Sequence, residues 1–138
     1  MGDAGDKCAL RLAATARKWL EDGRVVCSLR VGAPLTDAEG RWHAGAIAVA
    51  ADNVCAAAVF TALGADVLTV QYSLSYFSPA HLDEEVEMEG RVVGRKAALA
   101  AATVEVRKKE SGELVAICRQ WMAPLSTTKV STSTSSKL

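Results

Sequence analysis

The feature that most constrains the fold is the segment Ala44–Leu63, AGAIAVAADNVCAAAVFTAL, which is apolar almost without interruption. Its length alone would admit a membrane span. However, Asp52 and Asn53 sit at its centre, where an aspartate costs about 2.5–3.5 kcal/mol for insertion. A helix that is apolar on all sides in a soluble protein is one that other structure surrounds. We therefore expect a central, buried helix that ends at Gly64, and no membrane span.

Five runs with strand-like alternation surround this helix in the sequence. One precedes it, and four follow, so that the runs are 24–31, 69–77, 85–93, 97–108 and 114–122. In the second run, Tyr72, Leu74 and Tyr76 share one face, and Thr69 falls on the other. Short turns at 94–96 and 111–112 indicate antiparallel connections. The sequence thus predicts an α+β domain in which one antiparallel sheet wraps the long helix.

The two ends of the chain differ from this body. Apolar residues recur at helical spacing over 7–20, which predicts an N-terminal helix within 1–22. From Ser126 onward, nine of the thirteen residues are Ser or Thr, a composition typical of a flexible tail. We therefore divide the chain into a single domain, 1–125, and a tail, 126–138.

Charge and cysteine spacing exclude several functions. Sixteen Lys and Arg residues balance sixteen Asp and Glu residues, so the chain has no global positive field to hold nucleic acid. The cysteines are too far apart in the sequence for a zinc knuckle, and each sits among apolar residues: Cys8, Cys27, Cys55 and Cys118. We expect reduced thiols and no metal site.

Asp52 is the residue that most strongly indicates a catalytic site. A carboxylate within an apolar helix costs desolvation energy unless hydrogen bonds or a function compensate for it. It is either a structural aspartate whose hydrogen bonds are satisfied or a general base.

The start of the same helix, Arg41-Trp42-His43-Ala44-Gly45, is a second pointer. The first backbone N–H groups of a helix lack intrahelical partners, and together with the helix dipole they can stabilise an oxyanion. The small residues Ala44 and Gly45 would let a substrate carbonyl approach the backbone. On its own, the segment is better explained as an ordinary, tightly packed helix start.

The spacing of the two pointers has a geometric consequence. Gly45 and Asp52 are seven residues apart, so they share one helix face but lie about 10.5 Å apart along the axis. That separation is too large for both to act on one carbonyl. If both serve one site, the helix start comes from one subunit and the carboxylate from another, and a two-fold dimer holds two equivalent sites.

The chain resembles the hot-dog-fold acyl-CoA thioesterases in three strings: Trp42-His43-Ala44-Gly45-Ala46, Ala51-Asp52-Asn53 and Tyr76-Phe77-Ser78-Pro79. The family pattern is HGG, six residues, then an acid or Asn in the central helix. The similarity covers 24–124 and is greatest to the subgroup of thioesterase superfamily member 2 and the phenylacetyl-CoA type. It implies a hot-dog fold, with the helix as the sausage and the sheet as the bun, assembled as a homodimer or homotetramer.

The resemblance also implies roles for individual residues. Asp52 would be the general base or nucleophile, and the backbone N–H of Ala44, beside Gly45, would polarise the thioester carbonyl. Thr69 falls where relatives have a Ser that helps to hold water. Asp37 falls where they have an Asn near the thioester, and His43 would orient the loop. Two positions depart from the pattern, because Ala44 replaces a Gly and Asp37 replaces the Asn.

CoA would be part of the substrate, so no separate cofactor is expected. Its phosphates need cations, and Arg95 and Lys96 after Gly94 are the best candidates. Arg91 and Lys108 are weaker candidates. The bend Ser78-Pro79 is also counted with the residues that contact CoA. A solvated turn explains these charges equally well.

The last three residues, Ser136-Lys137-Leu138, match the peroxisomal address SKL. They stand at the end of a Ser/Thr-rich segment that an import receptor could grip, which predicts a location in the peroxisomal matrix.

Two other functions stay open at this stage. A hot-dog enoyl-CoA hydratase-like enzyme would want a longer motif with an Asp–His pair, which is absent here. An acyl-CoA-binding protein without catalysis would use Asp52 only structurally. The sequence does not indicate which acyl group is preferred.

Overall fold

The computed structural model describes residues 19–125. Within that range the chain forms six strands, one α-helix and one short 3-10 helix. In chain order they are β1 (Trp19–Glu21), β2 (Arg24–Arg30), η1 (Ala33–Leu35), α2 (Ala44–Leu63), β3 (Val67–Tyr76), β4 (Glu85–Lys96), β5 (Leu99–Lys108) and β6 (Leu114–Pro124). The expected tail, 126–138, and most of the expected helix at 7–20 lie outside the described residues.

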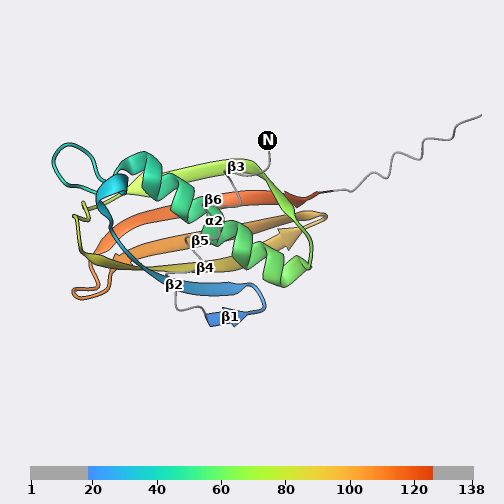
Figure 1. Cartoon of the computed structure of the whole chain (residues 1–138). Helices are drawn as coiled ribbons and strands as arrows, with labels where there is room; N and C mark the ends of the chain where they lie inside the picture. Colours follow the sequence, from blue (N-terminus) through green and yellow to red (C-terminus); the bar gives the residue numbers. More distant parts are fainter. Residues whose placement is uncertain (1–18, 126–138) are drawn as a thin grey trace, which may run out of the picture.

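The strands form a single antiparallel sheet in the order β1-β2-β4-β5-β6-β3, and α2 lies across one face of it (Figure 1). Short turns link β4 to β5 and β5 to β6, as the sequence predicts. β3 follows α2 and pairs only with β6, so it forms one edge of the sheet. The predicted α+β hot-dog architecture is confirmed.

Helix α2 has the predicted bounds, and its ends have clear local causes. The His43 side chain caps the first turn, and Gly64 ends the helix in the left-handed conformation at φ 66°. The expectation of burial on all sides is wrong for the single chain, because only one face packs on the sheet. On the other face, Val49 and Phe60 are about half exposed, at 51% and 50%. By length and composition alone, α2 would also be able to cross a membrane.

The N-terminal prediction is wrong at its last two residues. Trp19 and Leu20, expected in a helix, lie in β1 and pair with Val26 and Val25 of β2. Glu21 pairs with Arg24 across a tight turn in which Gly23 adopts a φ of 75°. The apolar spacing fits a helix, but the free edge of β2 and this turn make a strand at 19–21.

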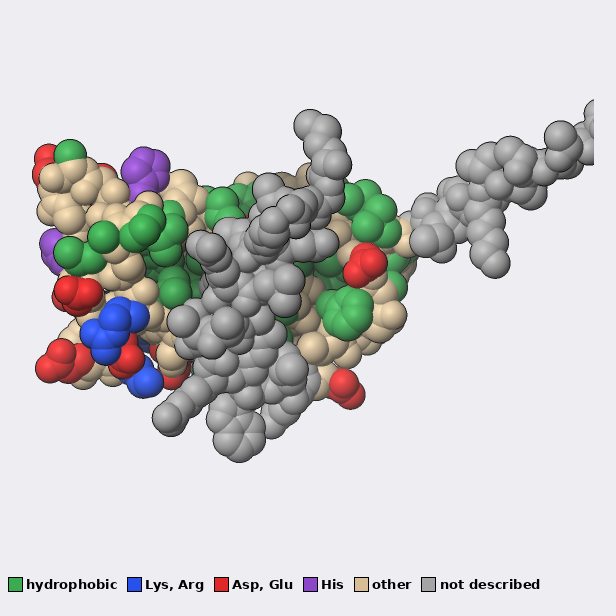
Figure 2. Space-filling view, viewed as in Figure 1, with side chains coloured by type: hydrophobic (Ala, Val, Ile, Leu, Met, Phe, Trp, Pro, Cys, Tyr) green, Lys and Arg blue, Asp and Glu red, His purple; other side chains and the backbone are tan. Residues whose placement is uncertain are grey.

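The core forms where α2 meets the middle of the sheet. Buried residues of α2, such as Val54 and Ala58, pack against aliphatic side chains of β4, β5 and β6, such as Met88, Val104 and Met122. In the same view, Figure 2 shows hydrophobic side chains on the face that carries α2 and charged side chains at the end with the β5–β6 turn. The sheet face and the helix thus share one core.

The tightest contact in this core is between Gly90 of β4 and Val54 of α2. A Cβ atom at Gly90 would lie 2.9 Å from Val54 Cγ1 and 3.1 Å from the Val54 carbonyl oxygen. Real Cβ atoms do not approach other atoms so closely, so the helix sits against the sheet only because residue 90 has no side chain. The alanine-rich composition of α2 serves the same close approach.

We therefore predict that Gly90→Ala destabilises the protein by about 1–3 kcal/mol, because the new methyl group overpacks the contact between helix and sheet. Gly94→Ala, in the same strand, is the matched control, since a Cβ there meets nothing within 4 Å. Urea unfolding of both variants measures the difference. Equal unfolding free energies for the two variants would contradict the packing argument.

Candidate active site

Asp52 lies midway along α2, partly exposed, on the side of the helix that faces β3 and β6. The Thr69 hydroxyl of β3 donates a hydrogen bond to Asp52 Oδ1 at 3.2 Å. The Gln120 amide nitrogen of β6 donates to the same oxygen at 2.6 Å. Both hydrogen bonds are made to Oδ1. The carboxylate is therefore fixed through Oδ1, and Oδ2 lies on its opposite side.

A β-bulge explains how Thr69 reaches Asp52. Simple alternation predicts Thr69 on the face opposite Tyr72, and this is wrong. Thr69 pairs with Met122 and Gln71 pairs with Trp121, so Val70 is an extra residue in β3. The bulge puts Thr69 and Tyr72 on the same face, toward α2, as bulges do when they re-aim a side chain.

Gln120 is the residue that the sequence analysis missed. Its amide contacts Asp52 and, at 3.3 Å, the Thr69 hydroxyl, and the side chain is only 2% exposed. The signal was present in the alternation of β6, where the face that packs on α2 is formed by Ala116, Cys118, Gln120 and Met122. A lone glutamine in an otherwise apolar strand face points to a buried polar partner.

At the start of α2, the His43 side chain accepts from one backbone N–H group and the Ala44 N–H is left unpaired among the described residues. His43 is the N-cap, and its Nδ1 accepts a hydrogen bond from the Gly45 N–H at 2.9 Å. The Ala44 N–H has no hydrogen-bond partner within residues 19–125. The Tyr76 hydroxyl donates to the Ala44 carbonyl at 2.9 Å and ties the helix start to β3.

The structure does not bring the helix start and Asp52 together within one chain. They belong to one continuous helix, so the separation of about 10.5 Å between Gly45 and Asp52 along the axis is retained. Asp52 and Thr69 meet, whereas Ala44, Gly45 and His43 lie two turns away at the end of the sheet where β3 ends.

Asp37 lies in the loop before α2, and its carboxylate is fully engaged there. Oδ1 accepts hydrogen bonds from the N–H groups of Glu39 and Arg41, and Oδ2 pairs with the Arg41 guanidinium at 2.9 Å. The backbone N–H of Arg41, foremost among these partners, lowers the pKa of the Asp37 carboxyl. Asp37 thus closes the loop that leads to the helix start.

The predicted CoA-binding residues fall at opposite ends of the sheet. Strand β4 continues to Lys96. Gly94, Arg95 and Lys96 are therefore the last residues of the strand and do not lie in the turn, which is at 97–98. At the other end of the sheet, the Ser78 hydroxyl donates to the Leu114 carbonyl at 2.6 Å, and Pro79 follows in the β3–β4 loop. Figure 1 shows the turns that mark these two ends.

The two weaker cation candidates are engaged with acids. Lys108 lies 3.0 Å from Glu113 and 3.8 Å from Glu84, and Arg91 pairs with Glu89. Their charges are thus compensated within the chain.

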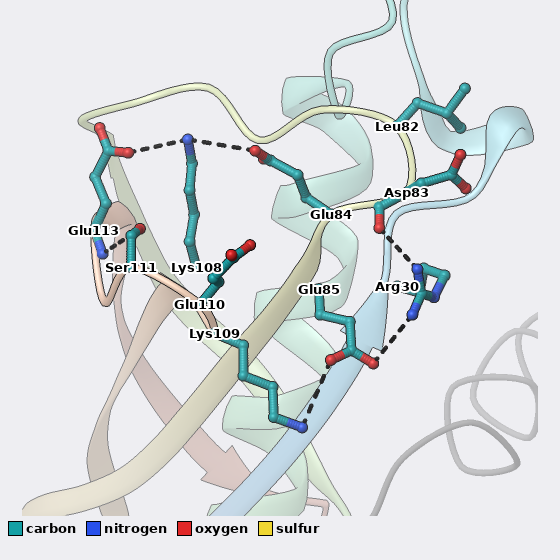
Figure 3. A pocket seen from close by; sticks show the side chains of 10 residues that line it. All are labelled: Arg30, Leu82, Asp83, Glu84, Glu85, Lys108, Lys109, Glu110, Ser111 and Glu113. Carbon is teal, nitrogen blue, oxygen red and sulfur yellow. Dashed lines mark hydrogen bonds and ion pairs between the residues drawn. The ribbon is translucent and has the colours of Figure 1, made fainter.

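A hollow of about 1000 Å³ lies beside the β5–β6 turn (Figure 3). Its wall carries acidic and basic side chains that pair with each other, such as Arg30 with Glu85 and Lys108 with Glu113. Neither Asp52 nor Thr69 lines it. Within residues 19–125, no group of three or more His, Cys, Asp or Glu side chains is placed to hold a metal ion. The candidate chemistry therefore centres on Asp52.

Comparison with known proteins gives this arrangement a family. The family model described as Thioesterase superfamily matches residues 39–115. Human acyl-coenzyme A thioesterase 13 is 33% identical over 95 residues, which are 68% of this chain and 68% of the human protein.

Solved structures share the fold. Zebra fish thioesterase superfamily member 2 is 26% identical and has a TM-score of 0.77, over 83% of this chain and 85% of that chain. A hypothetical thioesterase from Streptococcus pneumoniae, solved with coenzyme A, is 22% identical and has a TM-score of 0.79, over 88% and 94% of the two chains. The fold and the relatives together define the protein as a hot-dog-fold thioester hydrolase. The chain belongs to the thioesterase superfamily, which confirms the resemblance found in the sequence.

Proposed function

We propose that this thioester hydrolase cleaves acyl-CoA to the free acid and CoA, with Asp52 as the catalytic carboxylate. The observation that carries the proposal is the carboxylate in the middle of an apolar helix, held through Oδ1 by Thr69 and Gln120. The relative named acyl-coenzyme A thioesterase 13 supports acyl-CoA as the substrate class. Hydrolysis of a thioester needs only water as the second reactant.

In the proposed reaction, Asp52 Oδ2 accepts a proton from water, and the resulting hydroxide attacks the thioester carbonyl. The Thr69 hydroxyl, 3.2 Å from Oδ1, is close enough to help hold that water. The tetrahedral intermediate then collapses, the C–S bond breaks, and the thiolate of CoA takes up the proton. If Asp52 instead attacks the carbonyl directly and water then opens the resulting anhydride at the Asp52 carbon, single turnover in ¹⁸O-water labels Asp52 and leaves the first molecule of acid unlabelled.

The developing oxyanion is assigned to the Ala44 N–H at the start of α2. The His43 imidazole already accepts from the Gly45 N–H, whereas the Ala44 N–H, the first of the helix, is available to a substrate oxygen. The positive end of the helix dipole adds to this donor. His43 therefore acts by fixing the helix start, and Asp37 by closing the loop before it.

We further propose that the working unit contains two copies paired along β3. This edge strand is ten residues long, and large apolar side chains on it and on the residue after it are more than half exposed: Leu68, Val70, Tyr76 and Phe77. A long, apolar free edge is a template for pairing with another strand. Antiparallel pairing would bring the Ala44 end of one chain toward Asp52 of the other.

The same pairing bears on the CoA contacts. Antiparallel pairing would bring opposite ends of the two sheets together at each end of the dimer. Ser78-Pro79 of one copy would then lie at the same end as Gly94, Arg95 and Lys96 of the other copy. The cations Arg95 and Lys96 are the proposed partners of the CoA phosphates.

A peroxisomal location is the last part of the proposal, and it is supported by the terminal Ser136-Lys137-Leu138.

Asp52→Asn should lower kcat by about 10²–10⁴-fold, because the amide cannot accept the proton of water. Thr69→Ala should have a smaller effect, since it removes only a positioning contact. Release of free thiol from a panel of acyl-CoAs measures both and also gives the acyl preference. Asp66→Asn, the same chemical change at an exposed loop residue, is the control. Wild-type turnover in a folded Asp52→Asn protein would refute the assignment.

The shared site can be tested by complementation between two inactive variants, Asp52→Asn and Ala44→Pro. Proline removes the backbone donor, yet residue 44 is the first residue of α2, a position where proline is well tolerated. Half of the randomly formed dimers then contain one intact site of two, so mixing should restore up to about a quarter of wild-type activity. Exchanging, folded mixtures with no recovered activity would place the whole site in one chain.

Deletion of residues 136–138 should leave activity unchanged and move the protein from peroxisomes to the cytosol. Imaging of a fusion with a fluorescent protein at the N-terminus measures the location. Deletion of residues 131–133, which shortens the tail equally but keeps SKL, is the matched control. Peroxisomal signal that survives loss of SKL would show that another address directs the protein.

A further inference from the structure

Gln120 stands out as a polar side chain in an apolar setting. Across residues 22–125 it is the one polar or charged residue among those that are buried. Its neighbours on the same face of β6 are Cys118 and Met122, which pack into the core. Burying an amide in such surroundings is unfavourable unless its hydrogen bonds are satisfied.

The hydrogen bonds of Gln120 are satisfied on one side only. The amide nitrogen donates to Asp52 Oδ1 at 2.6 Å and lies 3.3 Å from Thr69 Oγ1. The amide oxygen is buried and has no partner among the described residues. An apolar side chain of the same length would fill the space without leaving such an orphaned atom, so packing alone does not explain a glutamine here.

The neighbours also fix which way the amide points. The Asp52 carboxylate only accepts hydrogen bonds when it is ionised, so the NH₂ group and not the carbonyl must face it. Through that group Gln120 links β6 to α2 and, with Thr69, to β3 at the same carboxylate oxygen.

We propose that Gln120 is a positioning residue for the hydrolysis: it fixes the rotamer of Asp52 so that Oδ2 stays directed at the attacking water. The inference rests on the proposed role of Asp52 as the base. It assigns to β6 a contribution to a site that the sequence pattern placed only on α2 and β3.

Three further titratable groups lie near Asp52 on the packed elements. Burial raises the pKa of the Tyr72 hydroxyl on β3, and the hydrogen bond with Cys118 raises the pKa of the Cys55 thiol on α2. Hydrogen bonds from Cys55 and Tyr72 lower the pKa of the Cys118 thiol on β6. The Cys55 and Cys118 sulfur atoms lie 3.9 Å apart in the core. Cys118→Ala therefore serves as the control for the loss of a core side chain on the same face of β6.

The test replaces Gln120 by methionine and, independently, by leucine, two apolar side chains of similar size. We expect kcat to fall by up to about 100-fold, the loss typical of a misplaced catalytic group, with KM changed little. Cys118→Ala, which removes another core side chain on the same face of β6, should keep wild-type kcat. Circular dichroism and thermal melting confirm the fold, and two variants guard against one failing to fold.

A second measurement asks whether Gln120 acts through Asp52. In an Asp52→Asn background, Gln120→Met should cost no further rate, because the group that it positions is already gone. If Asp52→Asn is inactive but both Gln120 variants keep wild-type kcat, the positioning role is refuted while the proposed function stands. If Asp52→Asn itself keeps wild-type turnover, the proposed function fails instead.

Discussion

The close approach of α2 to the sheet is the constraint on which the rest of this structure depends. It is possible because Gly90 has no side chain where Val54 meets β4, and because most of the sheet-facing residues of α2 are small. A helix seated this deeply brings Asp52 within 2.6 Å of a side chain on β6. A bulkier residue at position 90 would push the helix away from the sheet that supplies these donors.

The position of α2 against the sheet also determines which of its groups a substrate can contact. Asp52 is held from one side at the middle of α2, and the Ala44 N–H at its start has no partner among the described residues. These two features are fixed on one rigid element at a separation that one carbonyl cannot bridge. In the proposed dimer, a second copy paired at the exposed β3 edge would make both useful, and the apolar side chains along that edge suit such pairing.

Much of this was predictable from local patterns. The bounds of α2 follow from its uninterrupted apolar run and from Gly64, and five of the strands follow from alternation and turns. The errors share one cause, because the local spacing of apolar residues does not indicate which distant segments pair. Trp19 and Leu20 fit a helical repeat, yet they pair with β2. The helix is apolar all round in sequence, yet within residues 19–125 only one of its faces packs on the sheet.

By itself, the sequence determined that a carboxylate would sit in the middle of a small-residue helix with a donor-rich start, because helical rise and capping are local properties. Only the tertiary structure decided which side chains meet that carboxylate. Thr69 faces Asp52 because one extra residue, Val70, re-aims β3, and Gln120 arrives from a strand 68 residues away in the chain. Strand register and sheet order set both contacts, and these depend on how the whole sheet packs against α2.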